Sequence, residues 1–165
     1  MSKLQLGSIT FSTSVVRASV YPMEIKSRVR CFEGELIRFT HISRITQTPM
    51  TAAVFLPHSQ DSNAHFPSLL YLSGLTCTDE NVCTKGGPLF KLLASLQIAF
   101  IAPDTSPRGA NIQGESESWD FGTGAGFYLD ATQEPWSKNY KMYSYILDEL
   151  LPLIQSQFSA VNTNK

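Results

Sequence analysis

Residues 119–136 read WDFGTGAGFYLDATQEPW, and glycines at positions 122, 124 and 126 alternate there with small residues. A dinucleotide-binding loop has the spacing G-x-G-x-x-G between a strand and a helix, and a P-loop ends in Gly-Lys followed by Ser or Thr. Neither pattern is present, because the spacing here is G-x-G-x-G and Phe127 and Tyr128 follow it. The stretch predicts instead a backbone turn between aromatic side chains, in which small residues allow close packing against a neighbouring element.

This turn lies inside a long segment, residues 103–137, that has no periodic apolar pattern. A loop of this length in a compact domain is usually functional or disordered. Its content of Trp, Tyr and Phe argues against disorder, so we expect an ordered loop that packs near a site. Asp120 and Asp130 favour loop caps over catalytic acids. For Arg108, anion binding and a structural hydrogen-bonding role are equally supported.

Apolar runs on the amino-terminal side of this loop predict strands. A hairpin is expected over residues 28–43 around Glu33-Gly34, and short strands over 51–56, 68–72 and 97–102. An antiparallel start followed by strand, helix, strand and helix predicts an α/β sheet. Because loops 73–87 and 103–137 leave the carboxyl ends of strands, we expect them to meet at one rim of the sheet.

Leucine and aromatic spacing predicts two helices. The first starts near Pro88, and the second spans residues 139–158, bent by Pro152. The predicted buried face of the first consists of Leu89, Leu92, Leu93 and Leu96. That of the second consists of Tyr143, Ile146, Leu147, Leu150, Leu151 and Ile154.

Composition excludes several classes of protein. The 165 residues suit one domain, and a net charge of −1 gives no basic surface for nucleic acid or an acidic membrane. No apolar run approaches the roughly 20 residues that span a bilayer. The three cysteines (Cys31, Cys77, Cys83) and three histidines (His41, His58, His65) have no zinc-ligand spacing, and the free thiols favour a reducing compartment. No metal site is therefore predicted.

The first 23 residues contain Ser, Thr and two basic residues but no acid. This composition loosely fits an organelle transit peptide, although a poorly ordered leader is the favoured interpretation. We predict a leader over residues 1–27 and the domain over residues 28–165.

Leu72-Ser73-Gly74-Leu75-Thr76-Cys77-Thr78 leaves a predicted strand at a glycine. Serine esterases use a loop of this kind to donate a backbone N–H to the oxyanion of the transition state. A plain strand-to-helix turn fits the pattern equally well. Cys77 would be a nucleophile only beside a histidine, so a small, partly buried thiol is the favoured interpretation.

Four longer stretches resemble S-formylglutathione hydrolase, also called esterase D. They are YLSGLTCTDEN (71–81), APDTSPRG (102–109), GESESWDFGTGAGFYLDAT (114–132) and PWSKNYKMYSYILDELLPLI (135–154), and the resemblance extends from about Val29 to Phe158. It implies an α/β-hydrolase fold and hydrolysis of S-formylglutathione to glutathione and formate. It also implies a Ser-Asp-His triad, no metal or cofactor, and a cytosolic homodimer.

The resemblance further assigns site residues. Leu75 matches the position whose backbone N–H forms half of the oxyanion hole, with Ser73, Gly74 and Thr76 around it. Cys77 matches a cysteine close to the catalytic site. Trp119, Asp120 and the glycines at 122, 124 and 126 match a loop that borders that site.

The sequence departs from the family at the nucleophile. No G-x-S-x-G motif is present, and every histidine precedes the place where the nucleophile would come. We therefore expect the triad, and the strand that carries its serine, to lie beyond Lys165. We also expect this chain alone to be inactive and aggregation-prone, because a buried strand would become an exposed edge. The alternatives are a general carboxylesterase of the same fold, a non-catalytic product that pairs with a full-length subunit, and a fragment.

Overall fold

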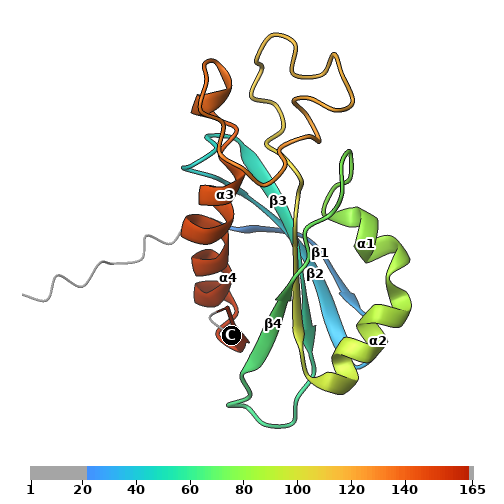
Figure 1. Cartoon of the computed structure of the whole chain (residues 1–165). Coiled ribbons are helices and arrows are strands. Elements are labelled where there is room, and N and C mark those ends of the chain that lie inside the picture. The colour runs from blue at the N-terminus through green and yellow to red at the C-terminus, as the bar shows by residue number, and fades with distance from the viewer. Residues whose placement is uncertain (1–21, 164–165) are drawn as a thin grey trace, which may run out of the picture.

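A six-stranded sheet runs through the middle of the computed structural model, which describes residues 22–163 (Figure 1). The strand order is β1-β2-β3-β5-β4-β6. The strands are β1 (Glu24–Arg30), β2 (Gly34–Ile42), β3 (Pro49–Pro57), β4 (Phe66–Leu70), β5 (Ala99–Pro103) and β6 (Val161–Asn162).

The sheet is mixed. The pairs β1–β2, β2–β3 and β3–β5 are antiparallel, whereas β5–β4 and β4–β6 are parallel. The predicted hairpin and α/β class are confirmed. β1 begins at Glu24, inside the segment that the sequence assigned to the leader, and residues 1–21 lie outside the described residues.

Helices cover both faces of the sheet (Figure 1). The helices α1 (Glu80–Lys85) and α2 (Gly87–Leu96) lie on one face. The other face carries α3 (Met142–Ser144), the π-helical segment η2 (Tyr145–Leu150) and α4 (Leu151–Gln157). A single 3-10 turn, η1 (Trp136–Lys138), precedes them. Within residues 22–163, none of the helices has the length and hydrophobicity that crossing a bilayer requires.

Each face of the sheet has its own apolar core. The larger core joins the sheet to η2 and α4 and includes Phe39, Val54, Ile101, Leu150 and Ile154. The smaller core joins the sheet to α2 and consists of Phe55, Phe90, Leu93, Ala94, Phe100 and Ala102. The centres of β3 and β5 are therefore buried on both sides, which explains why they read as continuous apolar runs rather than alternating ones.

The predicted buried face of α2 is partly wrong. Leu93 is buried, but Leu92 and Leu96 are 54% and 56% exposed. Phe90 takes the inner side instead, with its ring edge-on to Phe100 at 5.5 Å between centroids. The prediction considered only leucines and so missed Phe90. The packing of this ring against Phe100 sets the rotation of α2 about its axis.

The last helix also departs from its predicted face. Ile146, Leu150 and Ile154 are buried as expected, whereas Tyr143 and Leu147 are 58% and 43% exposed. The π-helical stretch adds a residue to the turn and so rotates the inner face. Tyr145 and Glu149 occupy the inside instead, and Pro152, which has no N–H to donate, lies in the first turn of α4.

Two further elements, α1 and β6, could be located only from the structure. The predicted loop 73–87 contains α1, a helix too short for its periodicity to be recognised. After the last helix, the short strand β6, which the sequence did not predict, pairs with Phe66 and Pro67 of β4. The place of the strand that carries the serine stays a prediction.

The two edges of the sheet differ in chemistry. All seven residues of β1 are exposed and include four charged side chains, and its pairing with β2 contains a bulge, features that discourage edge-to-edge association. At the other edge, β4 pairs beyond Pro67 only with β5 among the described strands. Leu69, Tyr71 and Leu72 are each at least 40% exposed there. This edge is therefore apolar and, among the described strands, only partly paired.

Candidate functional site

The loop after β4 forms a tight turn at the rim of the sheet. The Cys77 N–H donates to the Gly74 carbonyl at 3.1 Å, and the Thr76 N–H donates to the Gly124 carbonyl at 3.0 Å. Thr76 has a φ of 65°, in the left-handed region that costs a branched residue energy. On the amino-terminal side of these engaged amides, the N–H groups of Gly74 and Leu75 donate to no acceptor among residues 22–163. The turn therefore presents unused backbone donors at Gly74 and Leu75.

The glycine stretch that faces this turn packs against backbone at each glycine. A Cβ on Gly122 would lie 2.3 Å from the Glu115 carbonyl oxygen, and one on Gly126 would lie 2.6 Å from that of Thr105. A Cβ on Gly124 would approach the Thr76 Cα at 3.2 Å, and the φ of Gly124 is 82°. The prediction of a closely packed turn is confirmed, and its neighbour is the loop that carries Leu75.

One side chain fixes the glycine stretch within its own loop, and a second ties that stretch to the loop after β4. The Ser106 hydroxyl accepts the Gly124 N–H and donates to the Pro107 carbonyl, both at 2.8 Å. The Tyr128 hydroxyl donates to the Ser73 carbonyl at 2.8 Å. Burial raises the pKa of Tyr128, so the phenol stays protonated and remains a donor near neutral pH. The loops predicted to meet at one rim do so.

Arg108 has a structural role in this rim. Its guanidinium donates to both carboxylate oxygens of Asp104, at 2.7 and 3.0 Å, and to the Cys77 carbonyl at 3.2 Å. The Thr105 hydroxyl donates to the same carbonyl at 2.5 Å. The hydrogen bonds to Asp104 raise the pKa of Arg108. Of the two interpretations left open for Arg108, structural hydrogen bonding is the one observed.

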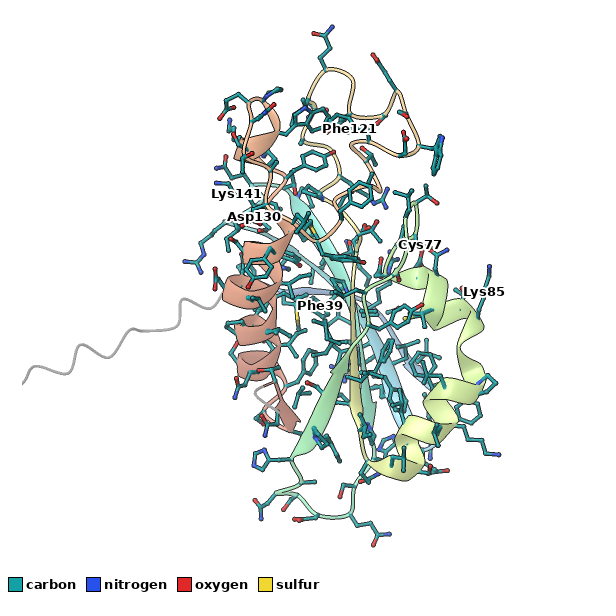
Figure 2. The ribbon with its side chains drawn as sticks, viewed as in Figure 1. Phe39, Cys77, Lys85, Phe121, Asp130 and Lys141 are labelled. Atoms are coloured by element: carbon teal, nitrogen blue, oxygen red, sulfur yellow. The ribbon has the colours of Figure 1, made fainter. Side chains whose placement is uncertain are left out.

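The cysteines lie apart from the histidine that the fold buries. Cys77 is a half-buried free thiol in the loop before α1 (Figure 2). His41 lies on β2 under the last helix, and its Nε2 is 3.1 Å from the Tyr145 hydroxyl. Burial raises the pKa of the Cys83 thiol to about 12, which keeps it protonated. The interpretation of these cysteines as packing residues agrees with this placement.

A hollow of about 220 Å³ opens beside Leu75. It is lined by Ser73, Gly74, Leu75, Thr105, Gly124, Ala125, Phe127 and Tyr128. Three of the predicted site residues, Ser73, Gly74 and Leu75, therefore lie together. Thr76 and Cys77 continue the same turn but do not line the hollow.

Trp119 and Asp120 lie away from this hollow. The Trp119 side chain is 70% exposed, and Asp120 accepts a hydrogen bond from the Ser118 hydroxyl. The acceptor role of Asp120 fits a loop cap. Of the lining residues, Gly124 was assigned to the border of the site through the resemblance, whereas Thr105, Ala125, Phe127 and Tyr128 were not assigned. Only Gly124 and the two aromatic residues carried a signal, as parts of the glycine turn.

No group of three or more His, Cys, Asp or Glu side chains in the described part of the chain is arranged to hold a metal ion. The group at this rim that can act on a substrate is the backbone N–H of Leu75, which is held in place at the mouth of a small, mainly apolar hollow. A fixed N–H of this kind stabilises negative charge that develops on a carbonyl oxygen.

Comparison with known proteins agrees with this chemistry. The family model "Putative esterase" matches residues 43–164. The curated S-formylglutathione hydrolase of Arabidopsis thaliana is 47% identical over 136 residues, which are 82% of this chain and 47% of the relative. That of Mus musculus is 51% identical over 130 residues, 78% of this chain and 45% of the relative.

A solved S-formylglutathione hydrolase from Agrobacterium tumefaciens superposes with a TM-score of 0.77 at 44% identity, covering 83% of this chain and 49% of that one. The predicted α/β-hydrolase fold is thereby confirmed. The chain spans about half the length of the relatives it matches. Because the family match covers well over half of its residues, this chain belongs to the esterase family.

Proposed function

We propose that this chain provides the oxyanion-binding half of an S-formylglutathione hydrolase. The observation that carries the proposal is the Leu75 N–H, which has no acceptor among the described residues while its neighbours Thr76 and Cys77 both donate hydrogen bonds. The 47–51% identity to proteins named S-formylglutathione hydrolase supports the choice of substrate.

In this reaction, the C–S bond of the thioester breaks, glutathione leaves as its thiol, and water supplies the hydroxyl group of formate. Charge builds on the formyl oxygen when a nucleophile adds to the carbonyl carbon. The Leu75 N–H donates to that oxygen, and the turn need not rearrange because Gly124 and Tyr128 already fix it. The nucleophile, the acid and the histidine are proposed to come from outside residues 1–165. A cytosolic location and a homodimer also stay predictions from the resemblance.

The first test is to sequence the transcript beyond the codon for Lys165. The longest continuous product that carries a G-x-S-x-G motif is then assayed with S-formylglutathione. Hydrolysis is expected, and a folded product with the motif but no turnover would reject the assignment.

The role of Leu75 has its own matched pair of variants in that product. Leu75→Pro removes the backbone N–H and should lower kcat by about 100- to 1,000-fold, the usual effect of losing one oxyanion donor. Leu75→Ala keeps the N–H and should retain most of the activity. Equal losses in the two variants would show that the Leu75 side chain, and not its amide, matters.

A further inference from the structure

A buried carboxylate lies at the carboxyl end of residues 73–79, the loop that carries Leu75 and is called here the Leu75 loop. Asp79 directly precedes α1 and is 0% exposed. It has the position of a helix N-cap, yet its side chain accepts no capping hydrogen bond. The Asn81 amide oxygen accepts the Thr78 N–H at 2.8 Å and closes this turn instead. The Asp79 carboxylate is therefore not used to start the helix.

Arg38 on β2 is the partner of this carboxylate. Its Nε donates to one oxygen of Asp79 at 2.5 Å, and its Nη2 donates to the other at 3.2 Å. Its Nη1 lies 3.0 Å from Oε1 of Glu80. Arg38 supplies both of the hydrogen bonds to the Asp79 carboxylate that form within residues 22–163. Because two parallel bonds from one guanidinium fix direction as well as distance, β2 sets both the place and the orientation of Asp79.

The burial of Asp79 makes the loss of this ion pair costly. Burial raises the pKa of Asp79, and the hydrogen bonds from Arg38 act in the opposite direction. The other titratable groups whose charges act on Asp79 cannot replace Arg38, because they are like charges, neutral groups or already paired. They are Glu80, Cys83, Asp104, Arg108 and Tyr145. Without Arg38, Asp79 must either take up a proton or move toward water.

The ion pair ties the Leu75 loop to a different part of the fold from its other contacts. The hydrogen bonds that Thr76 and Cys77 form with other segments all lead to the long loop 103–137. Asp79 is bonded instead to β2, which β3 and β5 separate from β4 in the sheet. Figure 2 shows Cys77 where the chain approaches α1. The Leu75 loop is therefore held at one end by the neighbouring loop and at the other by a strand.

We propose that Arg38 is a positioning residue, whose ion pair with Asp79 holds the Leu75 N–H where it meets the carbonyl oxygen of the substrate. The inference rests on the proposed function and deepens it, since it names a residue on β2 that acts through Asp79 without touching substrate. A donor stabilises charge in the transition state most effectively when it is fixed beforehand. A misplacement of about 1 Å can cost about 100-fold in rate.

The experiment measures hydrogen exchange of the Thr76 amide in the longest product that the transcript encodes. Arg38→Met removes the cation and keeps an unbranched side chain. Asp79 should then stay buried and protonated at pH 5.5, but should ionise at pH 7.5 and loosen the loop. Protection of Thr76, corrected for the intrinsic exchange rate, should fall about 10- to 100-fold between these pH values, the usual size of one hydrogen bond to a charged group. The original chain should show no such fall.

The amides of β3 are the internal reference, since this central strand exchanges through global unfolding. An equal loss of protection in β3 would mean that Arg38→Met lowers stability throughout, and would reject the positioning role. Arg38→Met combined with Asp79→Asn removes the titrating charge, so Thr76 should be equally protected at both pH values. A pH dependence that persists in this double variant would reject the role of Asp79.

Arg28→Met is the matched control. It breaks the pair that Arg28 forms with Glu35, at 2.7 Å between Nη1 and Oε2, on β1 and β2. It should leave the protection of Thr76 unchanged at both pH values. Arg38→Lys keeps the charge without the planar fork, and carries the test if Arg38→Met does not fold. It should lower the protection about three- to tenfold. Unchanged protection of Thr76 in a folded variant at Arg38 would overturn the proposal.

Turnover gives a second readout that is separable from the first. In a product that hydrolyses S-formylglutathione, Arg38→Met should lower kcat at pH 7.5 and change KM little, because the Leu75 N–H acts chiefly in the transition state. A raised KM with an unchanged kcat would reject the positioning role. Absence of turnover in every chain would reject the proposed function, whereas exchange of the Thr76 amide would still decide whether Arg38 holds the loop.

Discussion

Two hydrogen-bonded networks hold loops against the sheet, and they differ in what they leave exposed. The rim network joins the loop after β4 to the glycine stretch. Its members are Ser73, Thr76, Ser106, Gly124 and Tyr128. The buried network joins the loop between β2 and β3 to the last helix. Its members are His41, Ser43, Arg44, Ile45, Tyr145 and Glu149.

The buried network contains an ionisable pair inside the protein. Glu149 is 4% exposed and accepts hydrogen bonds from the Ser43 hydroxyl at 2.7 Å and from the N–H groups of Arg44 and Ile45 at 2.9 and 3.1 Å. The rim network is built from neutral groups, and it leaves the Leu75 N–H without an acceptor among the described residues. The comparison shows that polar contacts stabilise the fold in the buried network, whereas in the rim network they position the Leu75 N–H.

The largest effect is expected in the buried network. Glu149→Ala removes the buried carboxylate that accepts from the Ser43 hydroxyl and from the N–H groups of Arg44 and Ile45, and should lower the free energy of unfolding by about 3–4 kcal/mol. Asp148→Ala, at the exposed neighbouring position, should change it by no more than about 0.5 kcal/mol. Urea unfolding of the two variants measures both values. Similar losses would mean that helix propensity, and not the network, explains the effect.

The next effect concerns the close packing of the rim. Gly122→Ala combines a φ of 82° with a Cβ only 2.3 Å from the Glu115 carbonyl oxygen, and should cost about 2–3 kcal/mol. Gly109→Ala has a similar φ of 76° but nothing within 4 Å of the new Cβ, and should cost about 1 kcal/mol.

The difference between these two glycine variants isolates the contact from the backbone strain. Thermal unfolding gives the energies, and hydrogen exchange of the Thr76 amide reports whether the rim network has loosened. Equal costs in the two variants would show that the glycine turn adapts, and that it does not fix the Leu75 loop.

A smaller effect is expected from pH. Burial lowers the pKa of His41, and Tyr145 and Glu149 are the titratable groups that face it. The neutral imidazole is thus favoured in the folded state, while the unfolded chain takes up a proton below about pH 6.5. The stability that His41 contributes is complete above that pH. It falls as the pH decreases toward the lowered pKa, by at most about 1.4 kcal/mol per pH unit.

His41→Gln keeps a polar partner for Tyr145 and removes the titration. Chemical unfolding at pH 7.0, 6.0 and 5.5 should show a steeper loss of stability in the original chain than in this variant. Parallel pH profiles would show that His41 does not explain the dependence.

Strand and helix positions could largely be predicted from the sequence, because they depend on local apolar patterns. The central residues of the runs at 51–56 and 97–102, which are 52–55 and 99–102, are buried in the sheet, and the apolar composition of these runs predicted strands there. Helix faces were predicted less well. The exposed Leu92 and Leu147 show that rotation about the helix axis depends on a partner ring or on a π-helical turn, which spacing alone does not reveal.

The candidate site shows the same limit. The loop of Leu75 and the tight glycine turn could be predicted, since glycine spacing and strand ends are local features. That the two loops contact each other through Thr76 and Gly124 depends on 47 intervening residues and on the path of the sheet. The buried network gave no sequence signal, because His41 and Glu149 come from a strand and a helix that meet only in the folded chain.

The smallest expected effect tests whether the rim network positions the Leu75 loop. Tyr128→Phe removes only the hydroxyl that donates to the Ser73 carbonyl, so the free energy of unfolding should fall by about 1 kcal/mol. Tyr143→Phe removes the hydroxyl of a 58% exposed tyrosine on α3 and should change it by less than about 0.5 kcal/mol.

Hydrogen exchange is the more telling readout. If the rim network positions a donor, Tyr128→Phe should speed exchange of the Thr76 amide well beyond the small global change. Exchange there that changes only in step with global stability would show that Tyr128 stabilises the fold without positioning the Leu75 loop.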